Sequence, residues 1–168
     1  MPYLVRKIVK KNNLDNILES KDVNDIYADS IFSEFKTKEN TLSTWEAKDK
    51  ELIKTAILAI ALTSSNIETM DFIILDKDCL KTYNLNTEYT DPGKIPLTNF
   101  QQNHVDIINL TLDSLRNLAQ LYQNPLSCYC RVTKSELEKS IKDAFSNSLI
   151  DISCANPTLS PKLSSILN

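Results

Sequence analysis

The sequence has one glycine, Gly93, and one histidine, His104, among 168 residues. Phosphate-binding loops, dinucleotide-binding fingerprints and nucleophile elbows each need at least two glycines, because their backbone approaches a phosphate or holds a strained turn. The single histidine excludes zinc hydrolases that bind their metal through paired histidines. A serine or cysteine nucleophile activated by histidine is possible only through His104. These absences favour a protein that binds over an enzyme.

The sequence also lacks an excess of either charge and a long apolar run. Nineteen basic and 22 acidic side chains give a net charge of -3, so no overall attraction draws the chain to nucleic acid or to an anionic membrane. The longest apolar run, residues 52–62, is broken by Lys54 and Thr55 and is too short to span a bilayer. Arg6 follows only five uncharged residues, which argues against a signal peptide. We expect a cytoplasmic protein, and the Ile-, Asn- and Lys-rich composition is typical of an A+T-rich bacterial genome.

The cysteines do not have the spacing of a metal site. Structural zinc sites use two Cys-x₂₋₄-Cys pairs, whereas Cys128 and Cys130 are separated by one residue and Cys79 and Cys154 lie far away. In the expected cytoplasm these thiols are reduced and behave as small apolar side chains. We therefore expect no metal and no cofactor.

Hydrophobic periodicity predicts alternating strands and helices. The second predicted helix is apolar around more than half of its circumference and is expected at the centre of the core. Thr133 and Glu136 form a capping box that begins the last predicted helix. The predicted strands are residues 3–9, 41–45, 71–76 and 104–110. The predicted helices are residues 24–37, 50–63, 111–123 and 134–149, residues 11–13 are a predicted turn, and residues 84–103 are a predicted long loop.

This alternation predicts a single α+β domain over residues 1–152, with a mixed sheet of three to four strands packed with about four helices. Residues 153–168 form a C-terminal tail, in which Pro157 and Pro161 argue against a regular helix. The tail still carries four aliphatic side chains, which suit a docked or partner-binding segment. The predicted partner-binding residues are Leu159, Leu163, Ile166 and Leu167.

An alternative interpretation is a small metal-dependent nuclease. Glu46 and Lys48 follow a predicted strand as Glu-x-Lys, the order in which a carboxylate binds Mg²⁺ and a lysine orients the attacking water. Asp76 and Asp78 end the buried strand and could supply further ligands. However, Glu-x-Lys occurs three times in the sequence, which favours solvated surface charge for Glu46. Asp76 and Asp78 equally suit a turn or a helix N-cap, so the leading interpretation assigns no catalytic residue.

A second alternative is a nucleic-acid-binding accessory protein. Arg6, Lys7, Lys10 and Lys11 cluster on and after the first predicted strand, where each could attract a phosphate. Basic residues also protect exposed edge strands from pairing with other sheets. His104 stands next but one to Asp106 at the start of a predicted strand and is interpreted as a hydrogen-bonded structural histidine.

Three short blocks, residues 3–8 (YLVRKI), 40–45 (NTLSTW) and 104–106 (HVD), together with the leucine-rich helix that follows them, resemble a small bacterial protein family of unknown function. The resemblance implies an accessory protein that acts with the products of neighbouring genes, in a phage-defence or toxin-type operon. No catalytic residue is carried over from it. The leading hypothesis is a non-catalytic protein-interaction subunit of a bacterial multiprotein assembly, whose partner is another protein encoded nearby.

Overall fold

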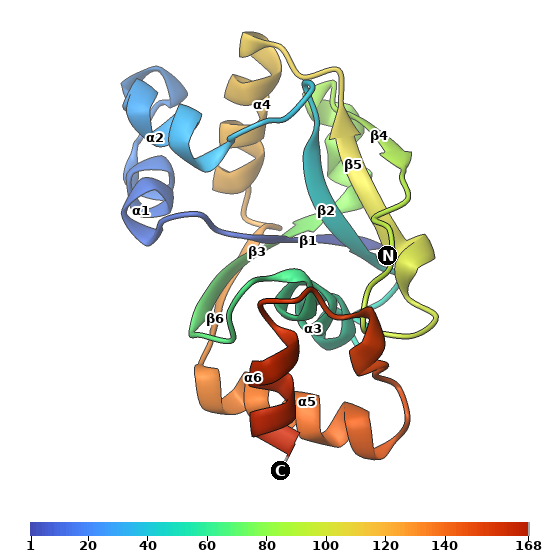
Figure 1. Cartoon of the computed structure of the whole chain (residues 1–168). Coiled ribbons are helices and arrows are strands. Elements are labelled where there is room, and N and C mark those ends of the chain that lie inside the picture. The colour runs from blue at the N-terminus through green and yellow to red at the C-terminus, as the bar shows by residue number, and fades with distance from the viewer. Residues whose placement is uncertain (168) are drawn as a thin grey trace.

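The computed structural model describes residues 1–167, which form one six-stranded antiparallel sheet with helices on both faces (Figure 1). The strand order is β4-β5-β2-β1-β3-β6, so the first strand of the sequence lies inside the sheet. The strands are β1 (Tyr3–Lys7), β2 (Leu42–Ala47), β3 (Met70–Asp76), β4 (Asn86–Tyr89), β5 (His104–Ile108) and β6 (Cys128–Val132). The predicted α+β class is confirmed, but the sheet has six strands where three or four were predicted. All of its pairings are antiparallel rather than mixed.

The helices form two layers, one on each face of the sheet (Figure 1). One layer holds α1 (Lys11–Glu19), α2 (Ala28–Glu34) and α4 (Leu112–Gln123), and the other holds α3 (Ile53–Thr63), α5 (Lys134–Ser146) and α6 (Ser160–Leu167). Short 3₁₀ turns lie at Val23–Asp25 (η1), Lys77–Tyr83 (η2), Gln101–Asn103 (η3) and Ile152–Cys154 (η4). Within residues 1–167, no helix combines the length and apolarity needed to cross a bilayer.

The alternation of side chains along the central strand explains why there are two cores. Leu4 of β1 and Ile8, which directly follows it, pack in the cluster of α1, α2 and α4, whereas Val5 packs in the cluster of α3. A strand buried on both faces therefore separates two apolar clusters. Every residue of 56–62 in α3 is buried, as its apolar circumference predicts. The capping box of α5 is also present, because Thr133 and Glu136 each accept from the other's backbone N–H.

Two strands and two helices, α1 and α6, depart from the sequence predictions. β4 lies within the predicted loop, and β6 lies where no element was predicted. Both are edge strands whose side chains are mostly exposed or partly exposed, so they lack the apolar alternation that identifies a strand in a sequence. Lys11–Glu19 is a helix where a turn was predicted at residues 11–13. Only Leu14 and Ile17 of this helix are buried, which gives a weak periodic signal.

The C-terminal tail lies on the α3 and α5 layer as helix α6 (Figure 1). The expectation that its prolines prevent a helix was wrong, because Pro161 stands in the first turn, where a backbone N–H has no intrahelical acceptor. Leu159 and Leu163 are fully buried in the core. The Asn156 side chain also donates to the Ser64 carbonyl at 3.2 Å, next to the end of α3. Residues 153–167 therefore pack as part of the same domain.

Candidate functional site

An apolar surface is left open where α2 and the first turn of α4 lie side by side. Phe32 is 54 % exposed and Leu112 is 71 % exposed. Beneath them, Phe35 of the α2 C-cap packs edge-on against Tyr122 of α4 with ring centroids 4.9 Å apart. This contact holds the two helices together, so that Phe32 and Leu112 are presented at a fixed spacing. We call residues Ile26, Ile31, Phe32, Leu110, Leu112 and Leu115 the α2–α4 surface.

Two hollows adjoin this surface, and Phe32, Leu112 and Leu115 line both of them. The larger hollow measures about 440 Å³, and its one charged lining residue among those described is Lys36. The smaller measures about 200 Å³, and its one charged lining residue in residues 1–167 is Arg116. The surface is thus an apolar ridge with a basic side chain on either side. Exposed apolar side chains that gather in one place are typical of protein-interaction sites.

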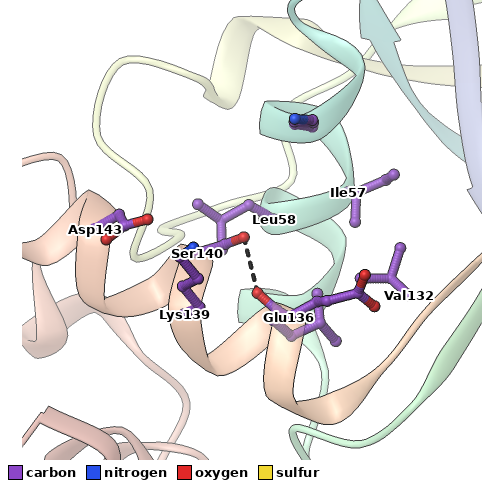
Figure 2. A pocket seen from close by; sticks show the side chains of 9 residues that line it. Ile57, Leu58, Val132, Glu136, Lys139, Ser140 and Asp143 are labelled. Atoms are coloured by element: carbon purple, nitrogen blue, oxygen red, sulfur yellow. Dashed lines mark hydrogen bonds between the residues drawn. The ribbon is translucent and has the colours of Figure 1, made fainter.

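A third hollow of about 430 Å³ lies between α3 and α5 (Figure 2). Figure 2 shows Ile57 and Leu58 of α3 facing Glu136 and Ser140, which stand one turn apart on α5. The Ser140 hydroxyl donates to the Glu136 carbonyl at 2.9 Å. The lining residues include two basic and two acidic side chains, Lys54, Lys139, Glu136 and Asp143. Because these charges compensate one another, this hollow favours no particular kind of partner.

A network of polar side chains joins three neighbouring strands on the α3 side of the sheet. The Asp106 carboxylate of β5 accepts from Ser43 of β2 at 2.9 Å and from Thr90, just after β4, at 3.0 Å. Thr90 Oγ1 also lies 2.8 Å from His104 Nδ1. His104 Nε2 lies 3.9 Å from Asp106 Oδ1. His104 is only 9 % exposed, and its predicted structural hydrogen bond is the one to Thr90.

A hollow of about 380 Å³ opens beside this network, and we call it the His104 hollow. Trp45 closes one wall, with its ring 5.0 Å from the His104 ring and stacked at 5.8 Å on Phe100. Its lining consists of Arg6, Lys7, Ser43, Trp45, Ile60, Thr63, Pro92 and His104. α3 lies over β1 and β2, and the hollow opens where Ile60 and Thr63 of this helix meet Ser43 of β2 and His104 of β5.

Glu46 is buried in an ion pair, so its interpretation as solvated surface charge was wrong. It is 5 % exposed and accepts a hydrogen bond from Lys77 at 2.9 Å and another from the Tyr89 hydroxyl. Burial alone raises the pKa of a carboxyl group, but the hydrogen bonds from Tyr89 and Lys77 outweigh it and hold the pKa of Glu46 below its ordinary value. Lys77 also lies over the Tyr89 ring at 4.7 Å. The cluster fixes edge strand β4 to the sheet.

The residues of the nuclease alternative do not point to one place. Asp76 pairs in register with Tyr3, as does Ala47 on the other side of β1. By alternation, Asp76 therefore lies on the α3 side of the sheet, and Glu46 lies on the opposite side. The Asp76 carboxylate caps η2 by accepting from the backbone N–H of Asp78 at 2.9 Å, while Lys48 and Asp78 are exposed. In the described part of the chain, no three His, Cys, Asp or Glu residues are grouped as metal ligands.

The basic residues of the nucleic-acid alternative are also separated. β1 is an inner strand, so these residues do not protect a sheet edge. Arg6 points toward α2, where its guanidinium donates to the Glu34 carbonyl at 2.6 Å. Lys7 lies on the other face and pairs with Glu68 at 3.6 Å, and Lys11 pairs with Asp15. Lys10 is exposed.

Arg6, Glu34 and Tyr122 form a second buried polar cluster beneath α1, α2 and α4. Glu34 Oε2 accepts from the Val9 backbone at 3.0 Å, but its Oε1 lies 3.8 Å from the Arg6 guanidinium. Glu34 Oε1, Arg6 Nε and the Tyr122 hydroxyl have no hydrogen-bond partner among residues 1–167. Burial exceeds the effect of Arg6 and raises the pKa of Glu34 to about 7. Burial also raises the pKa of Tyr122.

Known proteins do not supply a function for this chain. The comparisons find no matching protein-family model, curated protein or solved structure. The geometry of the described residues therefore carries the functional argument. Sequence reasoning placed Phe32 beside the apolar face of the first predicted helix and Leu112 on the buried stripe of its own helix. For both side chains, the position in the helix was the signal that could have indicated exposure. Phe32 lies beside the apolar stripe of Ile31 and Phe35, and Leu112 lies in the first turn of its helix.

Proposed function

We propose that this chain is a non-catalytic protein-interaction (accessory) subunit of a bacterial multiprotein assembly and that the α2–α4 surface binds its partner. The observation that carries the proposal is the joint exposure of Phe32 and Leu112 between two hollows. Apolar side chains that fill or flank hollows become binding hot spots when a partner excludes water from them. The resemblance to small bacterial proteins adds the setting, an antiviral (phage-defence) or toxin-type operon.

The surface replaces the tail as the proposed contact. Burying Leu159 and Leu163 within the domain leaves neither side chain accessible to a partner, whereas Phe32 and Leu112 need no rearrangement to be reached. Each adjoining hollow carries one basic side chain, Lys36 or Arg116. We infer that the partner presents an apolar segment with acidic side chains on its flanks, because opposite charges at the rim direct orientation and accelerate association.

The experiment is co-expression of the chain with the products of adjacent genes, followed by co-purification and a binding titration with any partner obtained. Phe32→Ser and Leu112→Ser should each weaken association by about tenfold or more, since each removes a central apolar contact. Phe145→Ser is the matched control, because Phe145 is 43 % exposed on α5, on the other face of the sheet. Association that survives both substitutions would refute the proposed surface.

A charge test separates this surface from nonspecific apolar adhesion. Lys36→Glu and Arg116→Glu leave the ridge intact but reverse the charge beside each hollow. Both should slow association, and the effect should shrink as the salt concentration rises. A partner whose binding is unchanged by either reversal would contradict the inferred acidic flanks.

A further inference from the structure

The protons of the polar network at β2 and β5 determine what the His104 hollow can bind. The Ser43 hydroxyl donates to Asp106 Oδ1, and the Thr90 hydroxyl donates to Asp106 Oδ2. Because Thr90 has a single hydroxyl proton, its oxygen must accept the remaining hydrogen bond, from His104 Nδ1–H. Neutral His104 is therefore held as the Nδ1–H tautomer, and its Nε2 carries a free lone pair.

The polar groups around the hollow that lack partners are acceptors. Among the described residues, His104 Nε2 makes no hydrogen bond, although His104 is nine-tenths buried. Nε2 faces the same Asp106 oxygen that binds Ser43, and Ser43 lines the hollow. The Thr63 hydroxyl donates to the Ile60 carbonyl at 2.9 Å, which leaves its oxygen as an acceptor as well.

Two carboxylates, those of Asp106 and Glu88, lie next to the wall of the hollow that Ser43 and His104 form. Glu88 of β4 stands directly opposite Asp106 of β5 on the same face, an arrangement in which like charges repel across the pair. Two basic residues line the hollow, Arg6 and Lys7, and the Lys7 ammonium group is paired with Glu68 at 3.6 Å. Arg6 directs its guanidinium to Glu34 on the opposite face. The carboxylates of Asp106 and Glu88 are thus without a cation among the described residues.

We propose that the His104 hollow binds a small organic cation with N–H donors, a primary ammonium or guanidinium group, between His104 Nε2 and Asp106 Oδ1. These two acceptors are 3.9 Å apart, so a single nitrogen about 2.9 Å from each can donate to both. The group can belong to a free amine or to a lysine or arginine side chain of another protein. This site is independent of the α2–α4 surface, because it lies on the other face of the sheet.

The chain carries its own reporters for the test. His104 is the one histidine and Trp45 the one tryptophan in the sequence, and their rings are 5.0 Å apart. Imidazole ¹⁵N resonances at alkaline pH should first identify the Nδ1–H tautomer. Titration with butylammonium, methylguanidinium or spermidine should then shift the Nε2 resonance and the Trp45 fluorescence to saturation. Tetramethylammonium has the same charge but no N–H donor, and should shift neither.

Matched variants assign the effect to the network. Asp106→Asn removes the charge at constant size and should weaken amine binding about tenfold or more, since the strongest hydrogen bonds here involve the ionised group. Thr90→Val removes the hydroxyl that holds His104 as the Nδ1–H tautomer. It should therefore weaken amine binding without changing the net charge. Glu51→Gln is the control and should bind as the parent does, because Glu51 is exposed just before the start of α3, whereas Thr63 stands at its end. Amide spectra of each variant check that the fold is kept.

A second titration, with N-acetyl-arginine methylamide, distinguishes a free amine from a protein side chain as the natural occupant. A response as strong as that to the free amines indicates a protein side chain as the natural occupant, and a much weaker response indicates a free amine. The proposal fails if the parent protein responds equally to tetramethylammonium and to the N–H donors, or to none of them. It also fails if His104 is found as the Nε2–H tautomer.

Discussion

Two buried ionic clusters on the same face of the sheet are built in opposite ways. In the Glu46 cluster, Lys77 donates to one carboxylate oxygen and Tyr89 donates to the other. The pKa of Glu46 is held below its ordinary value. In the Glu34 cluster, one carboxylate oxygen faces Arg6 at 3.8 Å without a hydrogen bond, and the pKa of Glu34 is raised to about 7. The charge of Arg6 is present, yet burial outweighs it.

The difference shows that a nearby countercharge does not by itself stabilise a buried carboxylate. The Glu46 cluster keeps one edge in solvent, since Tyr89 is 58 % exposed, and each oxygen has a donor. The Glu34 cluster is enclosed by three helices and leaves three polar atoms without partners. A buried polar atom that lacks a hydrogen bond lowers the free energy of unfolding by more than a formed hydrogen bond raises it. The contribution of the Glu46 cluster to stability should therefore not change with pH near neutrality, whereas that of the Glu34 cluster should change.

Removal of Arg6 should have the largest effect and should depend on pH. Arg6→Met leaves Glu34 buried without a cation and should reduce the free energy of unfolding at pH 8 by roughly 3–5 kcal/mol. The loss should be smaller at pH 5, where Glu34 becomes protonated. Urea denaturation at the two pH values measures both. Lys7→Met is the control, because its partly exposed pair with Glu68 should contribute less than about 1 kcal/mol. Equal losses at pH 5 and pH 8 for Arg6→Met would contradict this reading.

Titration of Glu34 should have the next largest effect. Its folded pKa of about 7 lies above the ordinary value of 4.5, so between these values the folded state binds more protons than the unfolded state. Stability from this group is fully present below about pH 4.5 and is lost as the pH rises through 7, by roughly 3 kcal/mol. Glu34→Gln should remove the dependence. The check is the difference between variant and parent stability, which should grow with pH over this window.

Disruption of the Glu46 cluster should cost less and should not vary between pH 5 and 8. Glu46→Ala should lower the free energy of unfolding by about 1–3 kcal/mol, and Tyr89→Phe by about 1 kcal/mol or less. Because the folded pKa of Glu46 is lowered, its contribution is complete above the unfolded pKa and is lost only as the pH falls below it. Thermal melts across this range provide the measurement, and a pH-dependent difference would place Glu46 with Glu34 instead.

The elements with strong apolar patterns could be predicted from the sequence, and those stabilised by long-range pairing could not. Residues 71–76 read as a buried strand, and the helix near residues 50–63 as the core helix. β4 has no apolar alternation and exists because Thr87 and Tyr89 pair with β5. Helix α6 was not predicted because a proline disrupts the interior of a helix but is tolerated in its first turn. The sequence alone does not show that the helix begins at Ser160, just before Pro161.

The same limit applies to the sites. A strand at residues 104–110 already places His104 and Asp106 on one face, since they are two residues apart. Ser43 and Thr90 join them only through the pairing of β5 with β2 and β4, which no local pattern specifies. Arg6 and Glu34 are 28 residues apart, and their contact depends on how α2 packs over β1. Phe32 and Leu112 stay exposed because nothing in residues 1–167 covers them.

The pairing of β2 with the much later strand β5 has a consequence for synthesis of the chain. Tyr3 of β1 pairs with Asp76 of β3, and Thr44 of β2 binds Val105, 61 residues later. At about 5–20 residues per second, β5 leaves the ribosome roughly 3–12 s after β2. During that interval β2 has a free edge of backbone N–H and C=O groups beside an apolar face, which is open to pairing with other chains. Co-translational protection of the first half of the chain, for example by a chaperone, would therefore determine how much of it folds correctly.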